Sequence, residues 1–139
     1  MAAGAEGDYI LPLLDARRKR VYYSFYQKSE NHNESFLEEI KKAASTAISE
    51  LPEILSEYKN KEITVVGEMT AEVSRVLEQN NFFVKQAAAE KNFTRAAVLA
   101  RLGQDYINSG QEDDIYQLKP AYLKQPQAEI NWQQKYAGN

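Results

Sequence analysis

The segment from Tyr9 to Tyr26, YILPLLDARRKRVYYSFY, constrains the fold more than any other part of the chain. Its first half is an apolar run that suits a strand buried on both faces. Its second half, Val21–Tyr26, alternates in the way that a half-buried strand does. Residues 15–19 can turn the chain between them, so the segment predicts a β-hairpin. Pro12 has no N–H to give a neighbouring strand, which favours a sheet edge or an outward-facing position.

The middle of the chain predicts a strand, a helix and a second strand. Ile63–Gly67 is a short β-branched run that suits a buried strand, and Phe82–Lys85 is another short strand candidate. Between them Thr70 can cap a helix, which Asn80 and Asn81 would end. Connections this short predict a parallel strand pair with a right-handed crossover.

The clearest helical pattern follows. It starts at Asn92 or Thr94 and ends at Gly110, and its apolar residues form a wide stripe, so we expect it to pack on the sheet. From Gln111 onward the chain is polar and broken by prolines. Such a tail folds only by lying on another surface. Its isolated apolar anchors are Ile115, Tyr116, Leu118, Tyr122, Leu123 and Trp132.

The length and composition limit the class of protein. A chain of 139 residues is long enough for one domain with a sizeable core. Cysteine is absent, which excludes disulfides and thiolate metal sites. The net charge of −3 argues against a whole-surface nucleic-acid binder. No apolar run approaches a membrane helix and no signal pattern opens the sequence, so we expect a cytoplasmic protein.

Three segments together resemble the C-terminal half of the TsaB (YeaZ) family, a component of the bacterial machinery for the threonylcarbamoyladenosine modification of tRNA. They are GDYILPLLDARRKRVYYSFYQ, ITVVGE and LKPAYLKQPQAEINW. The DAR after the first strand, the Val-Tyr on the second and the P-x-Y-L-K near the end carry the match. Their order and spacing extend over nearly the whole chain.

The resemblance implies an α/β fold. It implies a mixed sheet with an antiparallel meander of about three strands and one or two parallel strands, flanked by helices, as in half of an actin-like or ribonuclease-H-like (ASKHA) protein. In residues 36–48 the apolar spacing indicates a helix, whereas the family has a strand there. We predict a strand near Phe36–Lys42 and a helix from about Ser49, its cap, to Tyr58, with Pro52 in the first turn.

The resemblance also implies a division of the chain. A full family member carries an Asp-Thr-Ser strand and a Gly-Pro-Gly-Ser-x-Thr-Gly loop, and neither motif occurs in this sequence. We therefore expect the second of two subdomains. Residues 1–8 would be a residual interdomain linker, residues 9–110 the TsaB-like α/β subdomain, and residues 111–139 a C-terminal tail with anchor residues.

The hairpin turn holds the densest positive cluster of the chain. Four neighbouring cations could contact several tRNA phosphates. The alternative, which we favour, is a solvated hairpin tip that guards the strand edge, because alternating side chains would point to opposite faces. The cluster consists of Arg17, Arg18, Lys19 and Arg20.

Asp15 and Arg17 of the DAR motif are the pair with the strongest claim to a family-specific role. A carboxylate beside a guanidinium can orient the turn or a partner's loop through charge-assisted hydrogen bonds. The alternative, which we favour, is an Asx-type turn in which Asp15 accepts from the following backbone. The remaining candidates for a family motif or partner contact are Tyr22, Pro120, Tyr122 and Lys124.

The sequence predicts no catalytic residue, metal ligand or cofactor. His32 is the single histidine and has no spaced partners, so neither a metallopeptidase site nor a serine triad can be assembled. Gly67 could place a helix N-terminus near an anion. One glycine falls far short of a phosphate-cradling loop, and Glu68 beside it would repel phosphate.

These observations predict a non-catalytic scaffold or dimerisation protein. The resemblance implies a TsaD-like catalytic subunit and a TsaE-like ATPase as partners, with a homodimer as a further option, tRNA reached only through the complex, and no membrane. The alternative from another class is an independent small nucleotide-binding domain, or a hydrolase of glycoprotease-like ancestry. Either would need convergent polar groups in a pocket.

Overall fold

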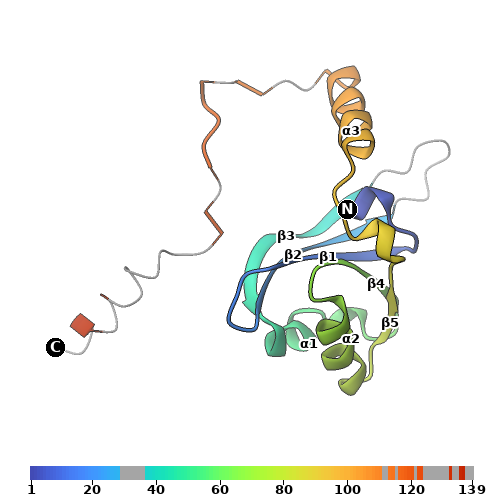
Figure 1. The fold of residues 1–139 in the computed structure, drawn as a ribbon, viewed down its shortest axis with the longest axis vertical. Coiled ribbons are helices and arrows are strands. Elements are labelled where there is room, and N and C mark those ends of the chain that lie inside the picture. Colours follow the sequence, from blue (N-terminus) through green and yellow to red (C-terminus); the bar gives the residue numbers. More distant parts are fainter. Residues whose placement is uncertain are drawn as a thin grey trace.

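The computed structural model describes residues 1–28, 37–110, 113–114, 116–120, 122–123, 132 and 135–136. Within them a five-stranded mixed sheet has the order β3-β2-β1-β4-β5 (Figure 1). The strands are β1 (Tyr9–Asp15), β2 (Arg20–Lys28), β3 (Leu37–Ala47), β4 (Glu62–Gly67) and β5 (Phe83–Gln86). The α-helices are α1 (Leu51–Ile54), α2 (Thr70–Gln79) and α3 (Ala96–Asn108), and the 3-10 helices are η1 (Ala2–Gly4), η2 (Ile48–Glu50), η3 (Ser56–Tyr58) and η4 (Ala89–Lys91).

The pairing confirms the predicted mixed architecture. Strands β1, β2 and β3 form an antiparallel meander, while β4 pairs parallel with β1 and β5 pairs parallel with β4. Helix α2 connects the parallel strands β4 and β5, as the strand-helix-strand pattern predicted. Among the helices in the described ranges, none is long and apolar enough to cross a membrane.

The hairpin is confirmed, and of the two positions expected for Pro12, a sheet edge or an outward-facing position, the sheet edge is wrong. Pro12 lies in β1, the middle strand of the sheet. The ladder with β2 is interrupted between the pairs Ile10–Tyr26 and Leu13–Tyr23, where a proline has no N–H to donate. This gap lets a central strand accept the residue.

Strand β3 confirms the strand predicted near residues 36–42 and extends beyond it to Ala47, while Phe36 lies outside the described residues. Its register against β2 shifts on both sides of Phe25. Each shift resets the alternation, so the half-buried residues fall at a spacing of three and one. Up to Ser45 they are Leu37, Ile40, Lys41, Ala44 and Ser45, and the strand ends with buried Thr46 and half-buried Ala47. A bulged strand therefore reproduces helical spacing.

The single helix predicted from Ser49 to Tyr58 is wrong in detail, because the segment forms η2, α1 and η3 in succession. Ser49 lies inside η2 and does not cap it. The longer Glu50 side chain instead accepts hydrogen bonds from the Ala47 N–H and the Thr46 hydroxyl. Pro52 does lie in the first turn of α1, as predicted.

The cap predicted for α2 is also wrong. Thr70 is already the first helical residue, and Met69 precedes it at φ 59°, with no side-chain cap. The predicted stop is confirmed, since Asn80 is the C-cap and Asn81 has φ 63°. A left-handed asparagine is a common way to end a helix.

The main core lies between the sheet and the helices α1 and α2 (Figure 1). Phe25 is fully buried there, and its ring centroid lies 6.0 Å from that of Tyr9 and 4.9 Å from that of Tyr58. The opposite face has a smaller cluster, in which Ile10 and Val66 are covered by the N-terminal segment. Helix α3 lies on this second side (Figure 1) and has no buried residue, so the prediction that it packs on the sheet is wrong.

Candidate functional site

Two loops meet where the parallel strands β1 and β4 end. The backbone N–H of Asp15 donates to Glu68 Oε2 at 2.7 Å, and the N–H of Glu68 donates to the Leu13 carbonyl at 2.9 Å. Gly67, at φ 110°, allows this close approach, and its N–H donates to Asn92 Oδ1 at 2.8 Å. The hairpin turn is therefore fixed to the loop that precedes α2.

Asp15 makes both interactions that the sequence suggested. Its Oδ1 accepts from the Arg17 N–H at 2.7 Å, which is the Asx turn, and its Oδ2 lies 3.5 Å from Arg17 Nη1. The Arg17 side chain is 87% exposed, so this ion pair contributes little stability. It holds the guanidinium near the turn and leaves most of it open to a partner.

The turn also stores backbone strain. Arg17, Arg18 and Lys19 have φ values of 64°, 55° and 57°, in the left-handed region. Each such residue costs about 1–3 kcal/mol, and such strain is concentrated at binding and catalytic sites. The backbone bonds from Ala16 N–H to the Arg20 carbonyl and from Arg20 N–H to the Arg17 carbonyl hold the conformation.

The charge around the turn is mixed. Arg20 Nη2 donates to the Ser45 carbonyl at 3.1 Å, so this cation is engaged within the chain. The carboxylate of Asp15 lies beside the cations, and that of Glu68 reaches the same turn from the loop before α2. Phosphates would meet these acidic groups too, which favours a protein surface over a nucleic-acid backbone as the contact.

Glu50 supports the far side of the turn. A hydrogen bond from the Thr46 hydroxyl, with a second from the Ala47 N–H and the charge of Arg20, lowers the pKa of the Glu50 carboxyl below its ordinary value. The Ile48 N–H donates to the Lys19 carbonyl at 3.0 Å. The end of β3 thereby fixes the turn from a second direction.

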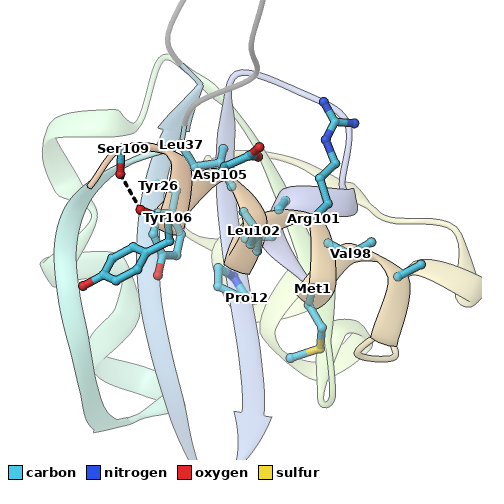
Figure 2. A pocket seen from close by; sticks show the side chains of 13 residues that line it. Met1, Pro12, Tyr26, Leu37, Val98, Arg101, Leu102, Asp105, Tyr106 and Ser109 are labelled. Atoms are coloured by element: carbon cyan, nitrogen blue, oxygen red, sulfur yellow. Dashed lines mark hydrogen bonds between the residues drawn. The ribbon is translucent and has the colours of Figure 1, made fainter. Parts of the chain in front are cut away.

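A cavity of about 780 Å³ lies between α3 and the second face of the sheet. Figure 2 labels Met1 and Pro12 among its lining residues, together with Arg101, Leu102 and Asp105 of α3. Within the described part of the chain neither charged residue of this set makes an ion pair. The cavity is therefore apolar with a separate cation and anion on one wall, a composition suited to a small amphipathic ligand.

The other predicted site residues are not brought together with Asp15 and Arg17. Tyr22 is half-buried on β2 and, by strand alternation, lies on the opposite face of the sheet from Asp15. Pro120 and Tyr122 are exposed. Lys124 and His32 lie outside the described residues. In the described ranges no group of three His, Cys, Asp or Glu residues lies close enough to hold a metal ion.

The sequence does not predict the roles of Glu68 and Asn92, whose side chains bond the Asp15 and Gly67 N–H groups, nor those of Arg101 and Asp105, the charged residues of the cavity. The sequence pattern predicts Glu68 only as a group that repels phosphate, and Asn92 only as a possible start of a helix. Their signal in the sequence is a carboxylate just after a strand-ending glycine and an amide just before a helix, which is too common to be specific. Arg101 and Asp105 are four residues apart on a helix, a spacing typical of any solvated face.

No family model matches the sequence, and no curated protein matches it significantly. The fold is similar to a crystal structure from Pseudomonas aeruginosa described as an uncharacterized protein with similarity to the peptidase YeaZ. The TM-score is 0.62 and the sequence identity is 17% over 85% of this chain. This chain spans about half the length of that protein, since the match covers 50% of it. The likeness confirms a YeaZ-like fold.

Proposed function

We propose that this chain belongs to a non-catalytic scaffold subunit resembling TsaB, which supports a TsaD-like catalytic subunit in the threonylcarbamoyl modification of tRNA adenosine. The observation that carries the proposal is the YeaZ-like fold over most of the chain. At this identity the likeness concerns the fold, and the three sequence segments that resemble the TsaB family supply the functional link. A TsaE-like ATPase would be a second partner.

The contact surface in this proposal is the turn at Asp15–Arg20. Arg17 is exposed, is held by a carboxylate, and rises from a backbone fixed by Glu68 and by the end of β3. A preorganised arginine loses little entropy on binding and can form paired hydrogen bonds with a carboxylate of a partner. Arginine is among the residues that most often dominate binding energy at interfaces.

The experiment is titration of a TsaD-like subunit with the chain by calorimetry. Arg17→Ala removes the guanidinium and leaves a non-glycine residue in the same left-handed backbone conformation. We therefore expect a loss of about tenfold or more in affinity, as for an interface arginine. Lys85→Ala on the exposed part of β5 is the matched control and should bind like the original chain. If both variants bind as tightly as the original chain, the turn is not part of the contact surface. If the original chain does not bind, the scaffold role is refuted.

A small-ligand domain is the second candidate, and the cavity beneath α3 is the observation that favours it. Arg101 could bind a phosphate or carboxylate, and the apolar wall could bind a ring. Nucleotide titration followed by calorimetry tests this function directly. Saturable binding that Arg101→Ala abolishes would support it, and absence of heat for every nucleotide would leave the scaffold role as the better explanation.

A further inference from the structure

Asp105 places a charged group on the inner face of α3. Asp105 and Val98 are half-buried, whereas the other residues of Ala96–Asn108 are exposed. The two lie seven residues apart, which is about two helical turns, so they share one face of the helix. Both line the cavity between α3 and the sheet (Figure 2). The Asp105 carboxylate is therefore part of the cavity wall and is partly withdrawn from water.

This carboxylate has no positive partner in the described part of the chain. Neither a side-chain cation nor the terminal amine of Met1 lies within salt-bridge distance of it there, and no side chain or N–H group donates a hydrogen bond to it. Arg101, one turn earlier, is at the spacing of a common helical ion pair. Figure 2 shows its guanidinium apart from Asp105 instead. Because a partly desolvated carboxylate is unfavourable without a partner, this wall suits the positive group of a ligand.

Arg101 supplies the opposite charge on the same wall. Its side chain lines the cavity and makes no ion pair or hydrogen bond with the described residues. A guanidinium presents N–H donors in a planar fork that matches a carboxylate. Two opposite charges one helical turn apart, each without a partner in the described chain, suit a ligand that carries both charges close together.

The rest of the cavity lining is mainly apolar. Pro12 and Leu37 contribute from the sheet, and Val98, Leu102 and Tyr106 contribute from α3. The volume of about 780 Å³ is within the range of small-molecule sites. A bulky apolar group therefore fits next to the two charges.

We propose that this cavity binds an α-amino acid with a large apolar side chain. The ammonium group of the ligand pairs with Asp105, its carboxylate pairs with Arg101, and its side chain lies against the apolar wall. A nucleotide fits less well, because its phosphate meets the charge of Asp105 as well as that of Arg101. The proposal rests on the second candidate function, the small-ligand domain, and names the ligand class of that domain.

Calorimetric titration of the full chain with L-phenylalanine tests the proposal. We expect saturable binding that is at least tenfold tighter than the binding of three reference compounds. Phenethylamine lacks the carboxylate, 3-phenylpropionate lacks the ammonium group, and glycine lacks the apolar side chain. Each comparison therefore measures one of the three contacts.

Two variants assign the charges to their partners. Asp105→Asn should weaken L-phenylalanine binding at least tenfold without weakening that of 3-phenylpropionate, which has no ammonium group. Arg101→Gln should weaken L-phenylalanine binding to a similar extent without weakening that of phenethylamine. Both variants should fold, as circular dichroism can verify, because neither side chain is bonded within the described chain. Asp113→Asn makes the same charge change outside the cavity lining and should bind like the original chain.

Absence of L-phenylalanine binding, or binding that both cavity variants leave unchanged, would overturn the proposal. Nucleotide binding that Asp105→Asn strengthens would also overturn it, but the small-ligand function would then stand, with a phosphate held by Arg101. Absence of heat with amino acids and nucleotides alike would refute that function too. The scaffold role is tested by the TsaD titration and does not depend on these results.

Discussion

Replacing Gly67 by alanine should destabilise the protein more than the same replacement at any other glycine of the described chain. Gly67 has φ 110°, where L-residues are strained, and the added Cβ would overlap the carbonyl oxygen of Leu13. That carbonyl cannot move away freely, because it accepts the hydrogen bond from the Glu68 N–H at 2.9 Å. The substitution therefore acts on the contact that fixes the hairpin turn to the loop before α2.

The expected loss can be estimated from two contributions. Forcing a non-glycine residue into this backbone region costs about 1–3 kcal/mol. Losing or lengthening the hydrogen bond to the Leu13 carbonyl costs about 1 kcal/mol. A total of about 3 kcal/mol corresponds to a fall in Tm of about 10 °C for a domain of this size.

Thermal unfolding followed by far-ultraviolet circular dichroism measures the loss. Gly4→Ala is the matched control, since its added Cβ would come no closer than 3.9 Å to Val98 Cγ2, an ordinary contact. We expect the control to change the free energy of unfolding by less than about 0.5 kcal/mol. A Gly67→Ala protein that unfolds at the temperature of the original chain would refute the reasoning on backbone strain and steric overlap.

Three further substitutions test the core and the turn. Phe25→Ala empties the centre of the aromatic cluster and should cost about 3–5 kcal/mol in urea unfolding; a loss below about 1 kcal/mol would show that the core can collapse around the gap. Glu68→Ala leaves the Asp15 N–H without its acceptor and should cost about 1 kcal/mol, whereas an unchanged urea midpoint would mean that water replaces the bond. Glu50→Gln tests pH dependence: the carboxyl has a pKa below the ordinary 4.5, so its stabilisation is present above that pH and is lost as the pH falls through the folded pKa. The variant should thus be less stable than the original chain at neutral pH and equal to it in strong acid, and a difference that persists in acid would contradict the assignment.

The sequence predicted the secondary structure best where local pattern and tertiary environment agree. Ile63–Gly67 is apolar on both sides, and as β4 it lies inside the sheet between β1 and β5. The helix caps were predicted less well. A capping oxygen can come from any nearby side chain, and in η2 the longer Glu50 takes the role that Ser49 was expected to fill.

The candidate site was predictable only in part. Asp15 and Arg17 are two residues apart, so their Asx turn follows from local chemistry. Glu68 is 53 residues from Asp15, and no local pattern can indicate that its carboxylate reaches the hairpin turn. The parallel pairing of β1 with β4 brings the two loops to one end of the sheet.

By itself the sequence determined the elements: alternation, β-branched runs and turn residues act over a few positions and specify a hairpin, a buried strand and a long helix. Only the tertiary structure decided how they face one another. Pro12 is accepted in a central strand because the neighbouring ladder has a gap there, and β3 imitates helical spacing because its register against β2 shifts twice. The apolar stripe of α3 is divided in the structure, since Leu102 and Tyr106 line the cavity whereas Leu99 and Ile107 are exposed. Its periodicity indicates that one face favours burial, whereas the surface that buries it depends on contacts distant in sequence.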